Sequence, residues 1–262
     1  GQLKGHLVEG FFQALNQVVD AAEPHEHAGL FRMWIERGFN VRGFGTVVSG
    51  IPTSGTVHVG DKLILSPGGQ VGRVRSMEVY GESSEAGRAG ECVALNLAGI
   101  DAEQLARGRV LCESDAFEAI EYFEAELSLL PSVRQPLKDY FEAHVHMGTA
   151  EAMANVALME RSDIRAGEPQ LVQVRLREPL SVAAGERFVV RAGVPRLAGG
   201  RVTTIGGGRV LGASGVRLRR KRPWTIELLS ARRAAIDSPA AWIGQCLSES
   251  AAPLAPEQLA RT

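Results

Sequence analysis

Two histidines and one glutamate are the first residues whose types and spacing could support chemistry. His144 and His146 are two positions apart, so on a β-strand both side chains would point to the same face. Together with Glu151 they could form the unrecognised active site of a barrel enzyme. A metal site would need a third ligand that the sequence does not identify, so we predict no metal site. We expect instead that this face contacts a neighbouring domain or RNA.

Glycine-rich segments could in principle hold phosphate groups, but the motif that does so is missing. The sequence contains no G-x-x-x-x-G-K-[ST], the loop that surrounds nucleotide phosphates and supplies their lysine. The glycines at 43 and 45 lie in β-type sequence, and the run Gly206–Gly208 follows a Thr-Thr-Ile strand. Neither opens a helix whose N-terminus could bind phosphate. We therefore predict that this chain binds no nucleotide and no other cofactor.

Arginines are concentrated in two segments of the second half of the chain. One segment has five within 23 residues, among glycines that let a backbone approach, which suits contact with RNA phosphates: Arg187, Arg191, Arg196, Arg201 and Arg209. The alternative is that these are solvated arginines on barrel rims. A second basic run, residues 217–222, would suit a linker near RNA, although such runs are usually solvated.

Bulk composition limits the class of protein. The 262 residues suffice for two modest domains, and 45% hydrophobic with 23% charged residues is a globular composition. The formal net charge of −1 gives no overall argument for nucleic acid. Three cysteines without short spacing exclude a CxxC metal knuckle and favour a reducing cytoplasm. No membrane span or signal peptide is apparent, so we predict a cytoplasmic protein without a membrane partner.

The residues named above must be positioned by strands. In the segment 30–61, Phe31, Met33 and Ile35 alternate with other residues as in a half-buried strand, and glycines then mark turns. Similar strands follow every 8 to 12 residues, with turn residues between them, which indicates closed barrels rather than βαβ units. We predict a mainly β fold with one barrel over residues 30–115 and a second over residues 116–215.

Helices are expected at both ends of the chain. Residues 1–22 have an apolar stripe that needs a partner to be buried, and from the residues alone we expect a helix packed on the first barrel. Residues 1–29 are this helix and a linker. Residues 216–262 are a basic linker followed by two helices, 224–236 and 240–247, and the start of a third near Pro256.

The strand pattern also resembles a known family. F-x-x-x-I-E-x-x-F-x-V-x-G-x-G-T-V-V-S-G, followed by S-G-x-V-x-V-G-D-x-L, is similar to the first barrel after the nucleotide domain in translational GTPases of the EF-Tu type. Residues 144–156, HVHMGTAEAMANV, and residues 203–211, TTIGGGRVL, resemble the second barrel of selenocysteine-specific elongation factors, the SelB type. The resemblance covers roughly residues 30 to 215.

This resemblance implies two EF-Tu-like closed barrels, after a helix of a missing GTPase domain and before the start of a winged-helix RNA-binding domain. The implied function is to bind selenocysteinyl-tRNA and deliver it to the ribosome. GTP and Mg²⁺ are expected on the missing domain, and a messenger RNA hairpin on the winged-helix region. The protein is expected to be a monomer. Whether this chain itself is an enzyme stays open, since the GTPase motifs are not in it.

The family places the aminoacyl end of the tRNA in a pocket on the first barrel, which corresponds here to Glu36, Arg37, Phe39 and Cys92. A carboxylate can accept from an amino group, an arginine can pair with the anionic selenol, and an aromatic ring can pack on the terminal base. The family commonly has Asp at position 36 and Arg at position 92. The alternatives are a buried Cys92 and a solvated Glu36–Arg37 pair, or a changed amino-acid preference.

Other functions remain as rivals. In the same class, the chain could be the barrel region of EF-Tu or of a tRNA-carrying initiation factor, although the C-terminal helices argue against both. In a different class, it could be a barrel enzyme or a protein-interaction module.

Overall fold

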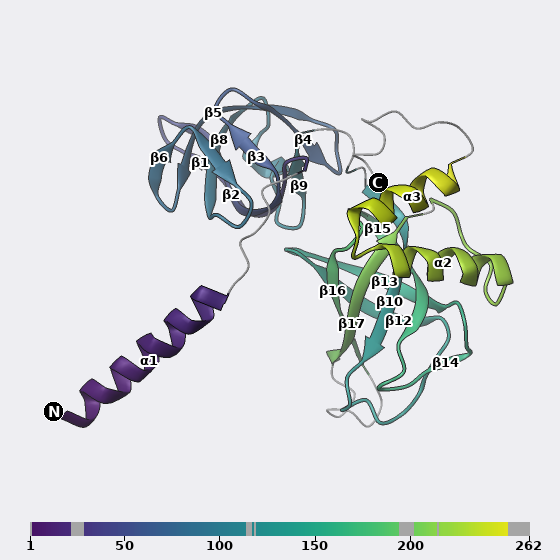
Figure 1. Ribbon diagram of the computed structural model, residues 1–262. Coiled ribbons are helices and arrows are strands. Elements are labelled where there is room, and N and C mark those ends of the chain that lie inside the picture. Colours follow the sequence, from purple (N-terminus) through teal and green to yellow (C-terminus); the bar gives the residue numbers. More distant parts are fainter. Residues whose placement is uncertain are drawn as a thin grey trace.

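The computed structural model describes residues 2–21, 29–113, 117, 119–193, 202–213 and 215–250. It contains two β-barrels side by side, with a long helix standing away from both and a pair of helices beside the second barrel (Figure 1). The prediction of a mainly β fold with two consecutive closed barrels is confirmed. Within the described residues no helix is both long and apolar enough to cross a membrane.

The first barrel is closed by antiparallel pairing of β4 with β5. Around it the strands follow in the order β4 (Lys62–Ser66), β9 (Val110–Cys112), β1 (Arg32–Val41), β2 (Gly45–Ser54), β8 (Val93–Ala98) and β5 (Val71–Val79). β6 (Glu82–Ser84) extends β5, and a separate pair is formed by β3 (Thr56–His58) and β7 (Ala86–Arg88). The segment between β8 and β9 contains the short 3₁₀ helix η1 (Ala102–Gln104).

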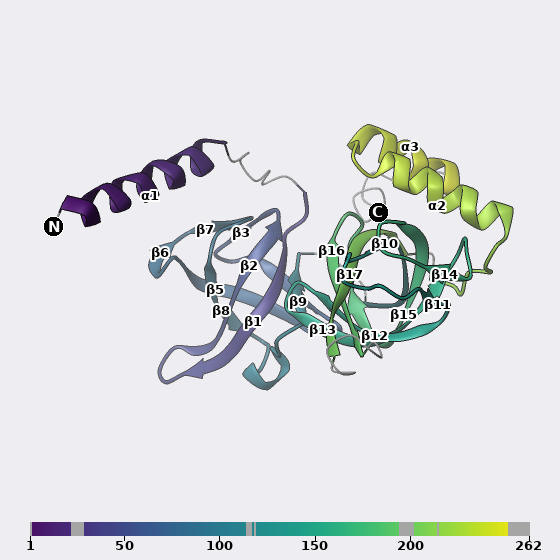
Figure 2. The same ribbon diagram turned by 90° about the horizontal axis from the view of Figure 1, so that it is seen from below.

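The second barrel is also closed, as the end-on view shows (Figure 2). Its strands follow in the order β10 (Ala119–Leu129), β15 (Gln170–Ser181), β13 (Ala150–Leu158), β12 (Phe141–Met147), β16 (Arg187–Gly193) and β17 (Val202–Gly212). β11 (Leu137–Lys138) pairs with β14 (Asp163–Ile164). The glycine run on β17 has a packing role: a Cβ at Gly206 would lie 2.3 Å from the Ser128 carbonyl oxygen, and one at Gly208 2.0 Å from that of Glu126.

A buried ion pair joins the two barrels. Arg32 on β1 is 1% exposed, and its guanidinium pairs with Glu186, whose backbone lies just before β16. Arg32 Nη2 also donates to the Ser181 carbonyl at 2.9 Å, and Trp34 Nε1 donates to Glu186 Oε1 at 3.0 Å. Trp34 itself belongs to the hydrophobic core of the second barrel. The N-terminal half of β1 is therefore built into the junction between the barrels.

The turn between β12 and β13 packs against the same tryptophan. Gly148 has φ +54°, and a Cβ on it would lie 2.4 to 2.5 Å from three atoms of the Trp34 indole. Trp34 is buried, so its ring cannot move aside. Glycine is required here both for the backbone conformation and for the contact between barrels.

The N-terminal helix α1 (Gln2–Ala21) does not pack on the first barrel. All its residues from 8 to 21 are exposed, including the large apolar side chains Phe11, Phe12 and Val18. The interpretation that its stripe is buried on the barrel is therefore wrong. An amphipathic sequence specifies an apolar face but does not identify what covers it.

The two predicted C-terminal helices are confirmed as α2 (Pro223–Ala235) and α3 (Pro239–Glu249). Ser238 caps α3 by accepting from the Ala241 N–H at 3.4 Å. The predicted third helix near Pro256 lies outside the described residues. Leu229 of α2 is fully buried in a small apolar cluster on the second barrel, formed with Ala157, Met159, Leu171 and Leu211. α2 is thus docked on the barrel rather than free of it.

A second buried ion network fixes this docking. Arg232 of α2 donates to Glu124 of β10 at 3.0 Å and to Glu249 of α3 at 2.6 Å. Glu124 is 0% exposed. Burial disfavours the charge of Glu249, but hydrogen bonds from Arg232 and Gln245 and the charge of Arg232 outweigh it and hold the pKa of Glu249 below its usual value.

The barrel junction can be tested with two glycines that share a backbone conformation. Gly148→Ala should lower the free energy of unfolding by about 2 kcal/mol more than Gly167→Ala, because overpacking is added to backbone strain. Gly167 has φ +78° but open space around its Cβ position, so it reports the backbone cost alone. Urea denaturation measures both; equal losses would contradict the packed junction.

The docking of α2 can be tested with two adjacent arginines. Arg232→Ala should cost about 3 kcal/mol or more of unfolding free energy, since it removes the cation that balances buried Glu124. Arg233 forms an exposed pair with Glu126 at 3.1 Å, so Arg233→Ala should cost less than about 1 kcal/mol. Guanidinium would screen these charges, so urea is the denaturant to use. A cost for Arg232→Ala no larger than that for Arg233→Ala would show that the network does not stabilise the fold.

Candidate nucleic-acid interface

A β-bulge on β1 shapes the outer face of the first barrel. The pairing of β1 with β2 shifts register between Ile35 and Arg37, and the two consecutive side chains Glu36 and Arg37 are both exposed. In a regular strand one of them would point into the barrel. Glu36 forms an ion pair with Arg107, also exposed. The bulge therefore places the Glu36 carboxylate and the Arg37 guanidinium next to each other in sequence on the surface.

The predicted aminoacyl pocket residues lie on β1 and directly before β8, two strands that both pair with β2. Arg37 and Phe39 are two positions apart and both exposed, so they share one face of β1. Arg37 pairs with Ser49 of β2, and Ser49 pairs in turn with Ala94 of β8. Cys92 lies two positions before Ala94, on the same face by alternation. The structure thus brings Arg37, Phe39 and Cys92 to one outer surface, with a strand between.

Cys92 is exposed, so the alternative that it is a buried small hydrophobic residue is wrong. Strand alternation could have given this result, because Val93, Leu95 and Leu97 are the buried residues of β8. Among the described residues, no hydrogen bond or ion pair connects the Cys92 side chain to Glu36 or Arg37. The thiol is accessible at the surface where the family pattern has a cation.

A hydrogen bond from the second barrel fixes the backbone at the bulge. The Thr149 hydroxyl, in the β12–β13 turn, donates to the Ile35 carbonyl oxygen at 2.6 Å. The Gly108 N–H donates to the same oxygen at 3.2 Å and to Thr149 Oγ1 at 3.2 Å. Sequence reasoning missed Thr149, because a threonine after a turn glycine carries no signal of what lies opposite. The geometry of the pocket residues therefore depends on both barrels.

The arginines predicted to contact RNA backbone divide into three groups. Arg187 and Arg191 are exposed on the same face of β16, four residues apart. Arg209 is engaged with the C-terminal helices: it pairs with Asp237 and donates to the Ile236 carbonyl at 3.4 Å. Arg196 and Arg201 lie outside the described residues. Arg187 and Arg191 lie on the exposed face of β16, and Arg209 of β17 is the cross-strand partner of Arg187.

The histidines and glutamate of the rival enzyme interpretation lie together on the second barrel. His144 Nδ1 is 2.7 Å from Glu151 Oε1, and His146 Nδ1 is 3.9 Å from Glu151 Oε2. The hydrogen bond with His144 holds the pKa of Glu151 below its usual value, so the carboxylate stays ionised. Within the described part of the chain, no three His, Cys, Asp or Glu residues could hold a metal ion. Arg191 lies opposite His144, so the group adjoins the basic face of β16.

Two family models match the two barrels. The model described as "Selenocysteine-specific elongation factor, beta-barrel domain" matches residues 124–216, and "Elongation factor Tu domain 2" matches residues 45–112. Among solved structures, a bacterial selenocysteine-specific elongation factor EF-Sec aligns with a TM-score of 0.69 at 22% identity, covering 93% of this chain and 38% of that chain. SelB from Methanococcus maripaludis in its apo form aligns with a TM-score of 0.68 at 22% identity, covering 78% and 47%. These two structures share the fold.

Curated relatives agree with the models. The chain is 32% identical over 219 residues to the selenocysteine-specific elongation factor of Desulfomicrobium baculatum, covering 84% of this chain and 32% of that protein. It is 30% identical over 204 residues to the one of Haemophilus influenzae, covering 78% and 31%. The chain therefore spans about a third of the length of these relatives. Because the family models match both barrels and these relatives agree with them, the chain belongs to the selenocysteine-specific elongation factor family.

Proposed function

We propose that this chain is the tRNA-binding part of a selenocysteine-specific translation elongation factor, which delivers selenocysteinyl-tRNA to the ribosome. The observation that carries the proposal is the shared outer face of Arg37, Phe39 and Cys92, on a bulge that the second barrel holds through Thr149. A surface on the first barrel whose backbone is hydrogen-bonded by the second suits a ligand that spans both. The match to both barrels of the family supports the same conclusion.

The chemistry of this surface fits an aminoacyl end. Selenocysteine is anionic at neutral pH whereas serine is not, so a cation such as Arg37 distinguishes them by charge. The Phe39 ring, 39% exposed, offers a face for the terminal adenine. The Glu36 carboxylate can accept from the α-amino group while Arg107 holds it in place. Arg187 and Arg191 of β16 would contact tRNA phosphates, with Arg196, Arg201 and Arg209 as further candidates.

The remaining parts of the proposal concern the longer protein. GTP and Mg²⁺ would bind a domain outside residues 1–262, in which no phosphate-binding loop occurs. Residues 216–262 would begin a winged-helix region that binds a messenger RNA hairpin, a proposal supported by the basic linker and by α2 and α3. The protein would act in the cytoplasm as a monomer.

A second candidate is the barrel region of another translational GTPase. It is favoured by 26% identity over 203 residues to elongation factor Tu 2 of Streptomyces avermitilis, covering 76% of this chain and 52% of that protein. The selenocysteine-specific model over residues 124–216 favours the first proposal. The two candidates differ in the amino acid that the tRNA carries, so one binding measurement separates them.

Filter binding of the chain to selenocysteinyl-tRNA and seryl-tRNA tests the proposal. A charge-assisted contact contributes about 1.5–3 kcal/mol, so Cys92→Arg should raise the preference for selenocysteinyl-tRNA about tenfold or more. Arg37→Gln should remove most of the preference. Arg88→Gln, which removes an exposed arginine on β7, is the control and should leave the ratio unchanged. Equal affinity for both tRNAs in all variants would reject the pocket.

A further inference from the structure

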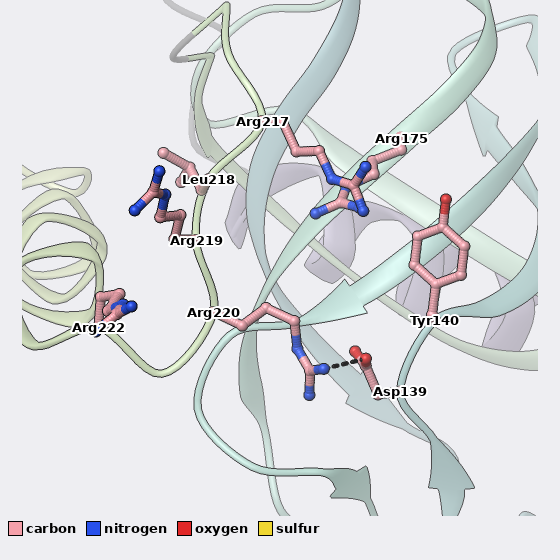
Figure 3. Close-up of a pocket in the computed structure, with 8 residues that line it drawn as sticks. All are labelled: Asp139, Tyr140, Arg175, Arg217, Leu218, Arg219, Arg220 and Arg222. Carbon is pink, nitrogen blue, oxygen red and sulfur yellow. Dashed lines mark ion pairs between the residues drawn. The ribbon is translucent and has the colours of Figure 1, made fainter.

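A basic pocket lies where the second barrel meets the segment that leads to α2 (Figure 3). Its volume is about 720 Å³. Strand β15, the turn before β12 and the linker all contribute to its lining, which consists of Asp139, Tyr140, Arg175, Arg217, Leu218, Arg219, Arg220 and Arg222. None of these residues belongs to the outer face of the first barrel. The pocket is thus separate from the surface assigned to the aminoacyl end.

The charge of this pocket is strongly unbalanced. Five arginines and one aspartate line it, a formal excess of four positive charges. The one carboxylate is already occupied: Asp139 pairs with Arg220, and its Oδ1 accepts from the Leu158 N–H at 2.7 Å. Among the described residues, no carboxylate forms an ion pair with Arg175, Arg217 or Arg219. The pocket therefore presents cations that the protein itself does not neutralise.

Arg175 is the most informative of these cations. It is only 8% exposed, yet it contacts the neutral side chain of Gln173, at 3.3 Å from Nε, and the Tyr140 ring, 5.3 Å from the guanidinium carbon. A buried charge without an opposite charge is costly. Arg175 and Arg217 both line the pocket, and their guanidinium groups overlap in the view of Figure 3. An anion bound in the pocket would supply the missing countercharge.

Hydrogen bonds of the Gln173 side-chain amide attach the linker to the barrel at this pocket. The fully buried Gln173 donates to the Val216 carbonyl at 2.8 Å and accepts from the Leu218 N–H at 3.1 Å. The same Oε1 atom accepts from Arg175 Nε. Arg220 Nε adds a 2.7 Å bond to the Leu158 carbonyl. The linker and the barrel therefore form one preorganised wall, and less ordering is needed when a ligand binds.

Tyr140 gives the pocket a second kind of contact. The residue is 47% exposed and its backbone has φ +63°, a conformation that is costly for a bulky residue. Such strain is retained where the surroundings fix it, often at functional sites. The ring is backed by Arg175 and leaves an exposed surface. A planar base can stack on an aromatic ring in this setting, whatever the sequence of the nucleic acid.

We propose that this pocket binds the phosphate backbone of an RNA strand, with an adjacent unpaired base stacked on Tyr140. Arginine forks match phosphate oxygens, and a phosphate next to a planar base that can stack on Tyr140 is a combination that RNA offers and an acidic peptide does not. The inference goes beyond the proposed function, because it names a contact at the barrel–linker junction. It does not depend on how the first barrel selects an amino acid.

The test measures binding of a fluorescent 12-nucleotide single-stranded RNA of mixed sequence to the whole chain, by anisotropy across a salt series. Arg217→Gln with Arg219→Gln should weaken binding about tenfold or more and reduce the salt slope by about 1.4, the value for two phosphate contacts. Both arginines are exposed, so the fold should persist. The control pair Arg88→Gln with Arg134→Gln removes the same charge elsewhere and should change affinity less than threefold.

Further variants and competitors in the same binding assay identify the class of ligand. Tyr140→Leu should lose about tenfold in RNA affinity while Tyr140→Phe keeps it, since stacking contributes about 1–3 kcal/mol per base. Inorganic phosphate and a mononucleotide should compete only at far higher concentrations than RNA, and a 12-residue polyglutamate should bind more weakly. Equal weakening by the control pair, equal binding of polyglutamate, or phosphate competing as well as RNA would each overturn the proposal.

The same variants separate this inference from the proposed function. Arg217→Gln with Arg219→Gln should lower affinity for selenocysteinyl-tRNA and seryl-tRNA by the same factor or not at all, leaving their ratio unchanged. If the oligonucleotide measurements contradict the RNA pocket, the ratio of the two tRNA affinities is unaffected. If the ratio experiment contradicts the proposed function, the oligonucleotide measurements are unaffected.

Discussion

The buried pairing of Arg32 with Glu186 is the interaction on which the arrangement of the two barrels depends. Each partner comes from a different barrel, and the Trp34 indole and the Ser181 carbonyl complete the polar contacts. Removing one partner of such a pair leaves the other charged in a low-dielectric environment, so the junction tolerates one geometry and resists others. Gly148 packs against the same tryptophan and lets the second barrel approach closely.

From this junction the constraint reaches the candidate site within a few residues of β1. Trp34 is followed by Ile35, whose carbonyl oxygen receives the Thr149 hydroxyl and the Gly108 N–H. The bulge begins at the next residue and turns both Glu36 and Arg37 outward. A change in the packing of the barrels would therefore alter the direction of Arg37. The surface proposed for the aminoacyl end is a property of the pair of barrels and not of the first alone.

Much of the fold could be predicted from alternation and glycines, because a strand with one buried face must repeat every two residues. Phe31, Met33 and Ile35 showed this pattern and face the core of the first barrel, but the strand is not half-buried there, because Arg32 and Trp34 are buried as well. The residues of the aminoacyl surface followed from the family motif. The tertiary partners could not be predicted. Nothing local in the sequence pairs Arg32 with Glu186, 154 positions away, or places Arg175 beside the linker. The helix α1 shows the same limit, since its apolar stripe was recognised but its exposure was not.

Gln173 gives the second barrel a property that an acidic side chain in its place would remove. Its amide nitrogen lies 2.9 Å from Glu124 Oε1, so a carboxylate at position 173 would force one of the two acids to keep a proton. The attachment of the linker would then vary with acidity. Because an amide does not titrate, the hydrogen bonds that Gln173 forms with the linker do not change with pH.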